Sequence, residues 1–263
     1  MQRWGQLACA LGLALATVTA GARQQTGNTP AAQTTERPKL SPSGHPNNDY
    51  WNEHDRQLLS DFPLLAAFHD EDIKLGPPRP GENRVVFMGD SITQGSHLDE
   101  SFPGKPYINR GISGQTTPQM LVRFRQDVVN LEPKVVVLLA GTNDIAGNTG
   151  PETLEQIEDN LKSMADLAST NGIKVVMCSV LPAYNYPWQP GMEPAPKIDA
   201  INTWMKAYAA EKGYVYVDYH SAMKDARDGL PPNLSKDGVH PLPAGFAIMS
   251  KLVEAGIEKA LGE

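Results

Sequence analysis

Compact apolar runs alternate with amphipathic runs along most of this chain, and this alternation limits the folds open to it. Each apolar run is short and rich in β-branched residues, as in "VVFM" at 85–88, which is typical of a strand buried on both faces. Strands that alternate with helices predict right-handed crossovers and a parallel sheet covered by helices on both faces. The expected strands are 85–88, 107–108, 135–140, 175–180 and 214–217, and the expected helices between and after them are 118–130, 153–171, 196–212 and 243–261.

Ligand sites in such sheets lie at the carboxyl ends of the strands, so the residues that follow each apolar run are the first candidates for function. Segments with glycines or polar residues occur at these positions. They are "GDS" at 89–91, "NRGISGQTT" at 109–117, "AGTND" at 140–144 and "DGVHP" at 237–241, the last just before the final helix.

The residue types in these segments complement one another chemically. A serine hydroxyl such as that of Ser91 becomes nucleophilic when a neutral imidazole takes its proton, and His240 can supply that imidazole. Asp237, earlier in the same segment, can fold back to accept a hydrogen bond from the imidazole ring. The oxyanion of a tetrahedral intermediate needs donors, and the candidates are the N–H groups of Ser91 and Gly114 and the amide of Asn143.

Each segment alone also has a purely structural interpretation. Asp90 and Ser91 are helix-capping residue types, His240 before a proline could be a loop histidine, and Gly114 could be a simple bend. The order of the segments favours catalysis, because a capping serine does not require a downstream Asp-x-x-His.

This order resembles that of the SGNH/GDSL hydrolases, a family named for the Ser, Gly, Asn and His of its sequence blocks. "GDSIT", "ISGQT", "GTND" and "DGVHP" match those blocks in order, and the resemblance covers 84–262. It implies a flavodoxin-like three-layer α/β/α sandwich with a five-stranded parallel sheet, and an esterase or lipase-type acyl hydrolase without metal or other cofactor. By motif position it implies Ser91 as nucleophile, His240 as base with Asp237 as its partner, and Ser91, Gly114 and Asn143 as oxyanion donors.

The loop "LPAYNYPWQPGMEPAP" at 181–196 is expected near the same edge of the sheet, because it follows a predicted strand. Its aromatic residues Tyr184, Tyr186 and Trp188 stand at alternate positions and could stack on a sugar or line an acyl groove. Packing of the loop onto the domain explains them equally well. The expected substrates are esters of small acyl groups, such as acetyl groups on glycans or short-chain lipid esters; thioesters and lysophospholipids suit the same mechanism.

Other functional classes have less support. A formal net charge of −7 argues against a nucleic-acid partner. A binding module that kept this fold without turnover is the main alternative, although it would have no chemical reason to keep Ser91, Gly114, Asn143, Asp237 and His240 together. A cofactor-binding flavodoxin-like protein lacks support, because the first strand ends in an acid rather than in a phosphate-binding glycine run.

The N-terminal segment predicts export. Residues 1–22 are expected to be a signal peptide cleaved after Ala22, because Arg3 precedes the apolar run at 7–16 and small residues precede the cleavage point. The mature protein is then periplasmic or secreted. A retained membrane anchor is the alternative, but the apolar run is short for a bilayer span.

The remaining boundaries follow from composition. Residues 23–48 are expected to be a disordered linker, since they contain almost no large aliphatic side chains. The hydrolase domain is expected over 49–263, with 49–83 as a lead-in packed on its outside. Cys9 would leave with the signal peptide, so Cys178 in "VVMCSV" is expected to be a free, buried core residue.

Overall fold

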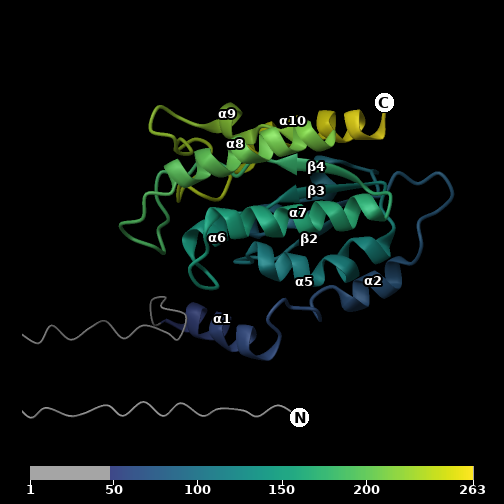
Figure 1. Ribbon diagram of the computed structural model, residues 1–263, viewed down its shortest axis with the longest axis horizontal. Helices are drawn as coiled ribbons and strands as arrows, with labels where there is room; N and C mark the ends of the chain where they lie inside the picture. The colour runs from purple at the N-terminus through teal and green to yellow at the C-terminus, as the bar shows by residue number, and fades with distance from the viewer. Residues whose placement is uncertain (1–47, 263) are drawn as a thin grey trace, which may run out of the picture. The chain divides into compact units, whose positions relative to one another are not determined.

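The computed structural model describes residues 48–262 (Figure 1). The expected signal peptide at 1–22, and the expected linker at 23–48 except for its last residue, lie outside these residues. Within the described residues, no helix combines the length and the apolar character that a bilayer span requires.

A parallel sheet of five strands lies at the centre of the domain, as predicted. Its order is β2-β1-β3-β4-β5, which is the flavodoxin-like order. Gly89 at the end of β1 is in register with Gly111 of β2 and Leu139 of β3, so these strands end at the same level. The strands are β1 (Val85–Gly89), β2 (Tyr107–Gly111), β3 (Val135–Leu139), β4 (Lys174–Cys178) and β5 (Val215–Val217).

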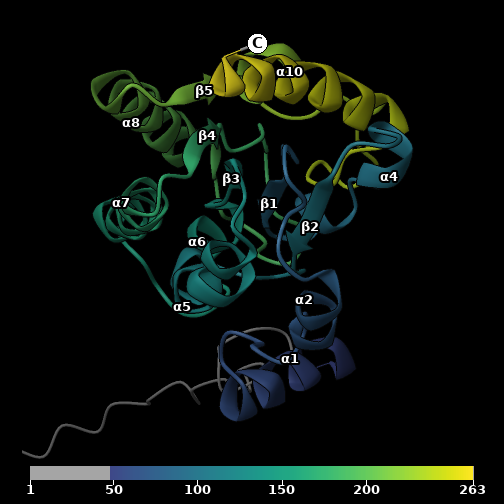
Figure 2. The same ribbon diagram turned by 90° about the vertical axis from the view of Figure 1, so that its right-hand side faces the viewer.

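Helices cover both faces of the sheet (Figure 2). One face carries α5 (Thr117–Asp127), α7 (Leu154–Thr170) and α8 (Ala195–Lys212). The other carries α3 (Ser91–Gln94), α4 (Leu98–Ser101), α9 (Tyr219–Met223) and α10 (Pro243–Leu261). The other helices are α1 (Asp49–Ser60), α2 (His69–Leu75), η1 (Val129–Leu131) and α6 (Thr142–Ala146).

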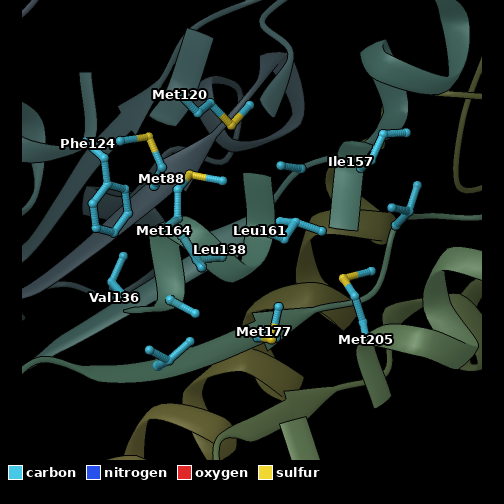
Figure 3. Close-up of a cluster of buried hydrophobic side chains, with 14 of the residues drawn as sticks. Met88, Met120, Phe124, Val136, Leu138, Ile157, Leu161, Met164, Met177 and Met205 are labelled. Carbon is cyan, nitrogen blue, oxygen red and sulfur yellow. The ribbon is translucent and has the colours of Figure 1, made fainter. Parts of the chain in front are cut away.

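Alternate residues of each strand supply the two halves of the core, because successive strand side chains point to opposite faces. In β1, Val86 and Met88 join the cluster under α5 and α7, whereas Val85 and Phe87 join the cluster under α10. Figure 3 shows the first cluster, in which methionines from strands and helices interdigitate. Cys178 is free and buried on the α10 side, as predicted.

The helix expected over 118–130 is divided in the structure. α5 ends at Asp127, and a short 3-10 turn, η1, follows it. The division falls at two successive β-branched residues, Val128 and Val129, whose side chains lose rotamer freedom in a helix.

The lead-in is held by glutamine side chains that donate to its backbone. The Nε2 atoms of Gln115, Gln119 and Gln126 donate to the carbonyl oxygens of Pro63, Phe62 and Leu65 over 2.8, 2.7 and 2.7 Å. These bonds fix the chain that leaves α1 against α5 and the loop before it.

Candidate active site

The turn from β1 into α3 is unusually tight at Gly89. A Cβ atom at this position would lie 2.8 Å from the carbonyl oxygen of Leu139 and would overlap the Thr93 side chain, so only glycine fits. Asp90 then caps α3, since its Oδ1 accepts a hydrogen bond of 2.9 Å from the N–H of Ile92. Capping by Asp90 leaves the neighbouring Ser91 half-exposed at the carboxyl edge of the sheet.

Ser91, His240 and Asp237 meet in one hydrogen-bonded line. Ser91 Oγ lies 2.9 Å from His240 Nε2, and His240 Nδ1 lies 2.6 Å from Asp237 Oδ2. The backbone N–H of His240 also donates to Asp237 Oδ1, over 2.8 Å, so the short segment folds back on itself. The sequence places Ser91 and His240 far apart, and the β1 edge and the loop before α10 bring them together.

Asp237 is ionised at any pH near neutrality. Partial burial acts to raise the pKa of Asp237, but hydrogen bonds from the His240 ring and from the N–H groups of His240 and Val239 outweigh it and lower the pKa to about 2. A carboxylate facing Nδ1 favours the tautomer in which Nδ1 carries the proton and Nε2 can accept one.

Asn143 and Gly114 lie beside this line. Asn143 is buried near the start of α6, and its Nδ2 donates to the Gln115 carbonyl over 3.0 Å and makes a longer contact of 3.4 Å with Asp90 Oδ2. Gly114 has a φ of 80°, a left-handed backbone conformation that favours glycine. Both residues and Ser91 line one pocket.

Two buried carboxylates support the surrounding loops. Burial raises the pKa of Asp90 to about 6, against the opposing effects of the Ile92 N–H bond and the nearby His240. Asp144 accepts hydrogen bonds from the N–H and the hydroxyl of Thr117, which tie the start of α6 to the start of α5, and burial raises the pKa of Asp144 as well.

A pocket of about 260 Å³ opens over the serine. Two of its walls are aromatic: Tyr50 and Trp51 come from α1, and Trp188 from the loop after β4. Sequence reasoning missed the α1 residues, because the lead-in was expected on the outside of the domain. The pocket is lined by Tyr50, Trp51, Ser91, Ser113, Gly114, Asn143, Asn148, Trp188 and His240.

Tyr184, Tyr186 and Trp188 were candidates for substrate contact, with packing of the loop as the equal alternative, and the structure divides them. Of the three, only Trp188 lines the pocket. Tyr186 is fully buried and stacks under Trp188 with ring centroids 5.1 Å apart, so it supports the indole from the core side. Tyr184 is 58% exposed beside Arg227. The alternation rule fails here because this loop is not a strand, and its side chains do not alternate between two faces.

Comparisons with known proteins identify relatives of this chain. A family model described as GDSL-like lipase/acylhydrolase matches residues 87–248. A crystal structure of a GDSL-like lipase from Bacteroides thetaiotaomicron is 44% identical, has a TM-score of 0.74, and the match covers 76% of this chain and 100% of that one.

Two curated relatives are named acetylxylan esterases. One, from Xylanibacter ruminicola, is 26% identical over 79% of this chain; the other, from Geobacillus stearothermophilus, is 27% identical over 66% of this chain and 94% of its own length. The chain spans about half the length, 48%, of the Xylanibacter ruminicola protein.

Proposed function

The chain belongs to the GDSL-like lipase/acylhydrolase family, and from this we propose that it hydrolyses carboxylic esters of small acyl groups through an acyl-enzyme on Ser91. One observation carries the proposal: Ser91, His240 and Asp237 form a continuous hydrogen-bonded line of 2.9 and 2.6 Å at the floor of a pocket. A serine held this close to an imidazole that faces a carboxylate is activated as a nucleophile.

The proposed reaction has two halves. His240 Nε2 takes the hydroxyl proton as Ser91 Oγ attacks the ester carbonyl carbon, and Asp237 stabilises the imidazolium that forms. The N–H groups of Ser91 and Gly114 and the Asn143 amide hold the oxyanion. Collapse of the intermediate expels the alcohol, which receives the proton from His240. Water, deprotonated by His240, then attacks the carbonyl carbon of the acyl-enzyme. As the bond between that carbon and Ser91 Oγ breaks, His240 returns the proton to Ser91 Oγ and the acid leaves.

We propose acetyl groups on glycans as the substrate class. The two relatives named acetylxylan esterases support this choice, as do the aromatic walls, since indole and phenol faces suit sugar rings. A volume of about 260 Å³ lies just below the range of typical ligand pockets and suits a short acyl group better than a long one. Residues 1–22 support action outside the cytoplasm.

The test is a substrate panel of acetyl, butyryl and octanoyl esters with acetylated xylo-oligosaccharides. We expect the acetyl substrates to react fastest, and Ser91→Ala to lower kcat at least about 1,000-fold. Ser163→Ala in α7 is the matched control and should behave as native protein. Equal rates for native protein and Ser91→Ala would refute the nucleophile, and a native protein inactive on every ester would favour a binding module.

A further inference from the structure

Asn148, just after α6, contacts two of the three residues of the proposed oxyanion site at once. Its side chain is buried, and its Nδ2 donates to Asn143 Oδ1 over 2.9 Å and to the Gly114 carbonyl over 3.3 Å. Its Oδ1 accepts a hydrogen bond of 3.1 Å from the indole N–H of Trp188. The Asn148 amide thus joins the loop that carries Gly114, the start of α6 and the aromatic wall of the pocket.

The direction of these bonds is fixed by Trp188. An indole N–H can only donate, so the end of the Asn148 amide that faces it must be the oxygen. The Nδ2 of Asn148 then faces Asn143 Oδ1. The Nδ2 of Asn143, at the other end of the same amide, is therefore directed away from Asn148. This Nδ2 donates to the Gln115 carbonyl over 3.0 Å and makes the longer contact of 3.4 Å with Asp90 Oδ2, and this longer contact is the one that a substrate oxyanion can replace.

We propose that Asn148 is a positioning residue that sets the geometry between Gly114 and Asn143, and that Trp188 fixes its orientation. The inference rests on the proposed ester hydrolysis. Because Trp188 also lines the pocket, the surface that meets the substrate and the donors that stabilise the oxyanion belong to one hydrogen-bonded chain. Substitutions in this chain therefore act on turnover, even for a substrate too small to contact Trp188.

Two single variants test Asn148 and Trp188 one at a time. Asn148→Ala should lower kcat for 4-nitrophenyl acetate about 10- to 100-fold with little change in KM, below the 100- to 1,000-fold loss typical of removing an oxyanion donor itself. Trp188→Phe keeps an aromatic ring and removes the indole N–H, and should lower kcat about 3- to 10-fold. Asn171→Ala at the end of α7 and Trp204→Phe in α8 are the matched controls.

The double variant tests whether Trp188 acts through Asn148. If it does, adding Trp188→Phe to Asn148→Ala lowers kcat by clearly less than Trp188→Phe lowers it in the native protein, because the second substitution has nothing left to disturb. Fully additive losses would overturn the role of Trp188. A folded Asn148→Ala protein, checked by its Tm, with kcat within threefold of native would overturn the role of Asn148. Trp188→Phe keeps the test available if Asn148→Ala does not fold.

A second readout separates this inference from the proposed function. In a fluorophosphonate, Ser91 Oγ attacks phosphorus, its proton passes to His240, fluoride leaves, and the phosphonyl oxygen occupies the oxyanion position. Labelling should slow in Asn148→Ala by the same factor as kcat. Slower labelling with a native protein that cleaves no ester would refute the proposed function and support the inference. Equal labelling rates would refute the inference, whatever the ester panel shows.

Discussion

Two carboxylates lie near Ser91, and their surroundings give them opposite properties. Asp237 has a side chain that is 42% exposed and receives several hydrogen bonds, so its pKa falls to about 2. Asp90 is 1% exposed, and burial raises its pKa to about 6. The first is suited to hold a charge beside His240, and the second acts on the stability of the turn that presents Ser91.

Asp237→Asn should separate the charge of this residue from its shape. The amide can donate to His240 Nδ1 and so favours the tautomer with its proton on Nε2, which cannot accept the serine proton. We expect kcat to fall about 100- to 10,000-fold at neutral pH. The measurement is kcat for native, Asp237→Asn and the exposed control Asp159→Asn, with folding checked by circular dichroism. A folded Asp237→Asn with kcat within threefold of native would exclude a catalytic role for the charge.

Asp90→Asn should alter how stability depends on pH. The pKa of Asp90 is about 6 in the folded protein and about 3.9 in an unfolded chain, so the folded state holds the proton more tightly. Its contribution to stability is complete below pH 3.9 and is lost as pH rises through 6, a loss of about 3 kcal/mol. The Asp90→Asn variant does not lose this stability, because the asparagine side chain does not titrate. Denaturant unfolding at pH 4, 5, 6 and 7 should show its free energy of unfolding gaining about 2 kcal/mol relative to native protein across this range, because part of the loss already occurs below pH 4; parallel curves would contradict the assignment.

At the scale of elements, α1 shapes the pocket although it lies outside the part of the chain that the family model matches, 87–248. Trp51 is buried, packs edge-to-face against Tyr50 and His54, and lines the same pocket as the catalytic candidates. The preference of this protein for one acyl or alcohol group is therefore expected to depend on α1.

Trp51→Ala should widen the pocket on the α1 side. We expect kcat/KM for acetyl esters to fall. We expect the ratio of octanoyl to acetyl kcat/KM to rise, because the cavity left by the indole admits a longer chain. Loss of a buried tryptophan also lowers stability, by about 3 to 5 kcal/mol, so assays belong well below the Tm of the variant. Leu59→Ala, on the same helix at an 85% exposed position, is the control. An unchanged octanoyl-to-acetyl ratio would show that α1 does not set acyl preference.

For the whole molecule, the strands and main helices were predictable because their signals are local. Runs such as 135–140 are buried on both faces and show it in composition alone, and α7 begins at a capping box, Thr153 with Gln156. The resemblance gave the flavodoxin-like class, and the five-stranded parallel sheet is confirmed. The order β2-β1-β3-β4-β5 comes from the structure, since periodicity does not say which strands are neighbours.

The rest of the candidate site depends on contacts between distant segments. Ser91, Asn143 and His240 could be predicted as site residues, because each follows a strand or precedes the last helix in a recognisable block. Asn148 and Trp51 could not: nothing local distinguishes a buried amide that bridges two loops, or a tryptophan in a polar lead-in, from an ordinary surface residue. Tyr186 was misjudged for the same reason, since its burial follows from the path of its loop.

The lead-in is held by hydrogen bonds to the backbone carbonyl oxygens of Phe62, Pro63 and Leu65. Such bonds do not depend on which side chains these residues carry. Phe62 and Leu65, which are 38% and 39% exposed, can change identity without loosening the hold of Gln115, Gln119 and Gln126. The same argument applies if α1 is replaced by a different helix. Because the replacement helix would be joined to the unchanged segment 62–65, we expect it to lie in the same place over Gly114. The sequence of the helix that stands over the pocket can therefore vary while the segment 62–65 stays attached to α5 and the loop before it.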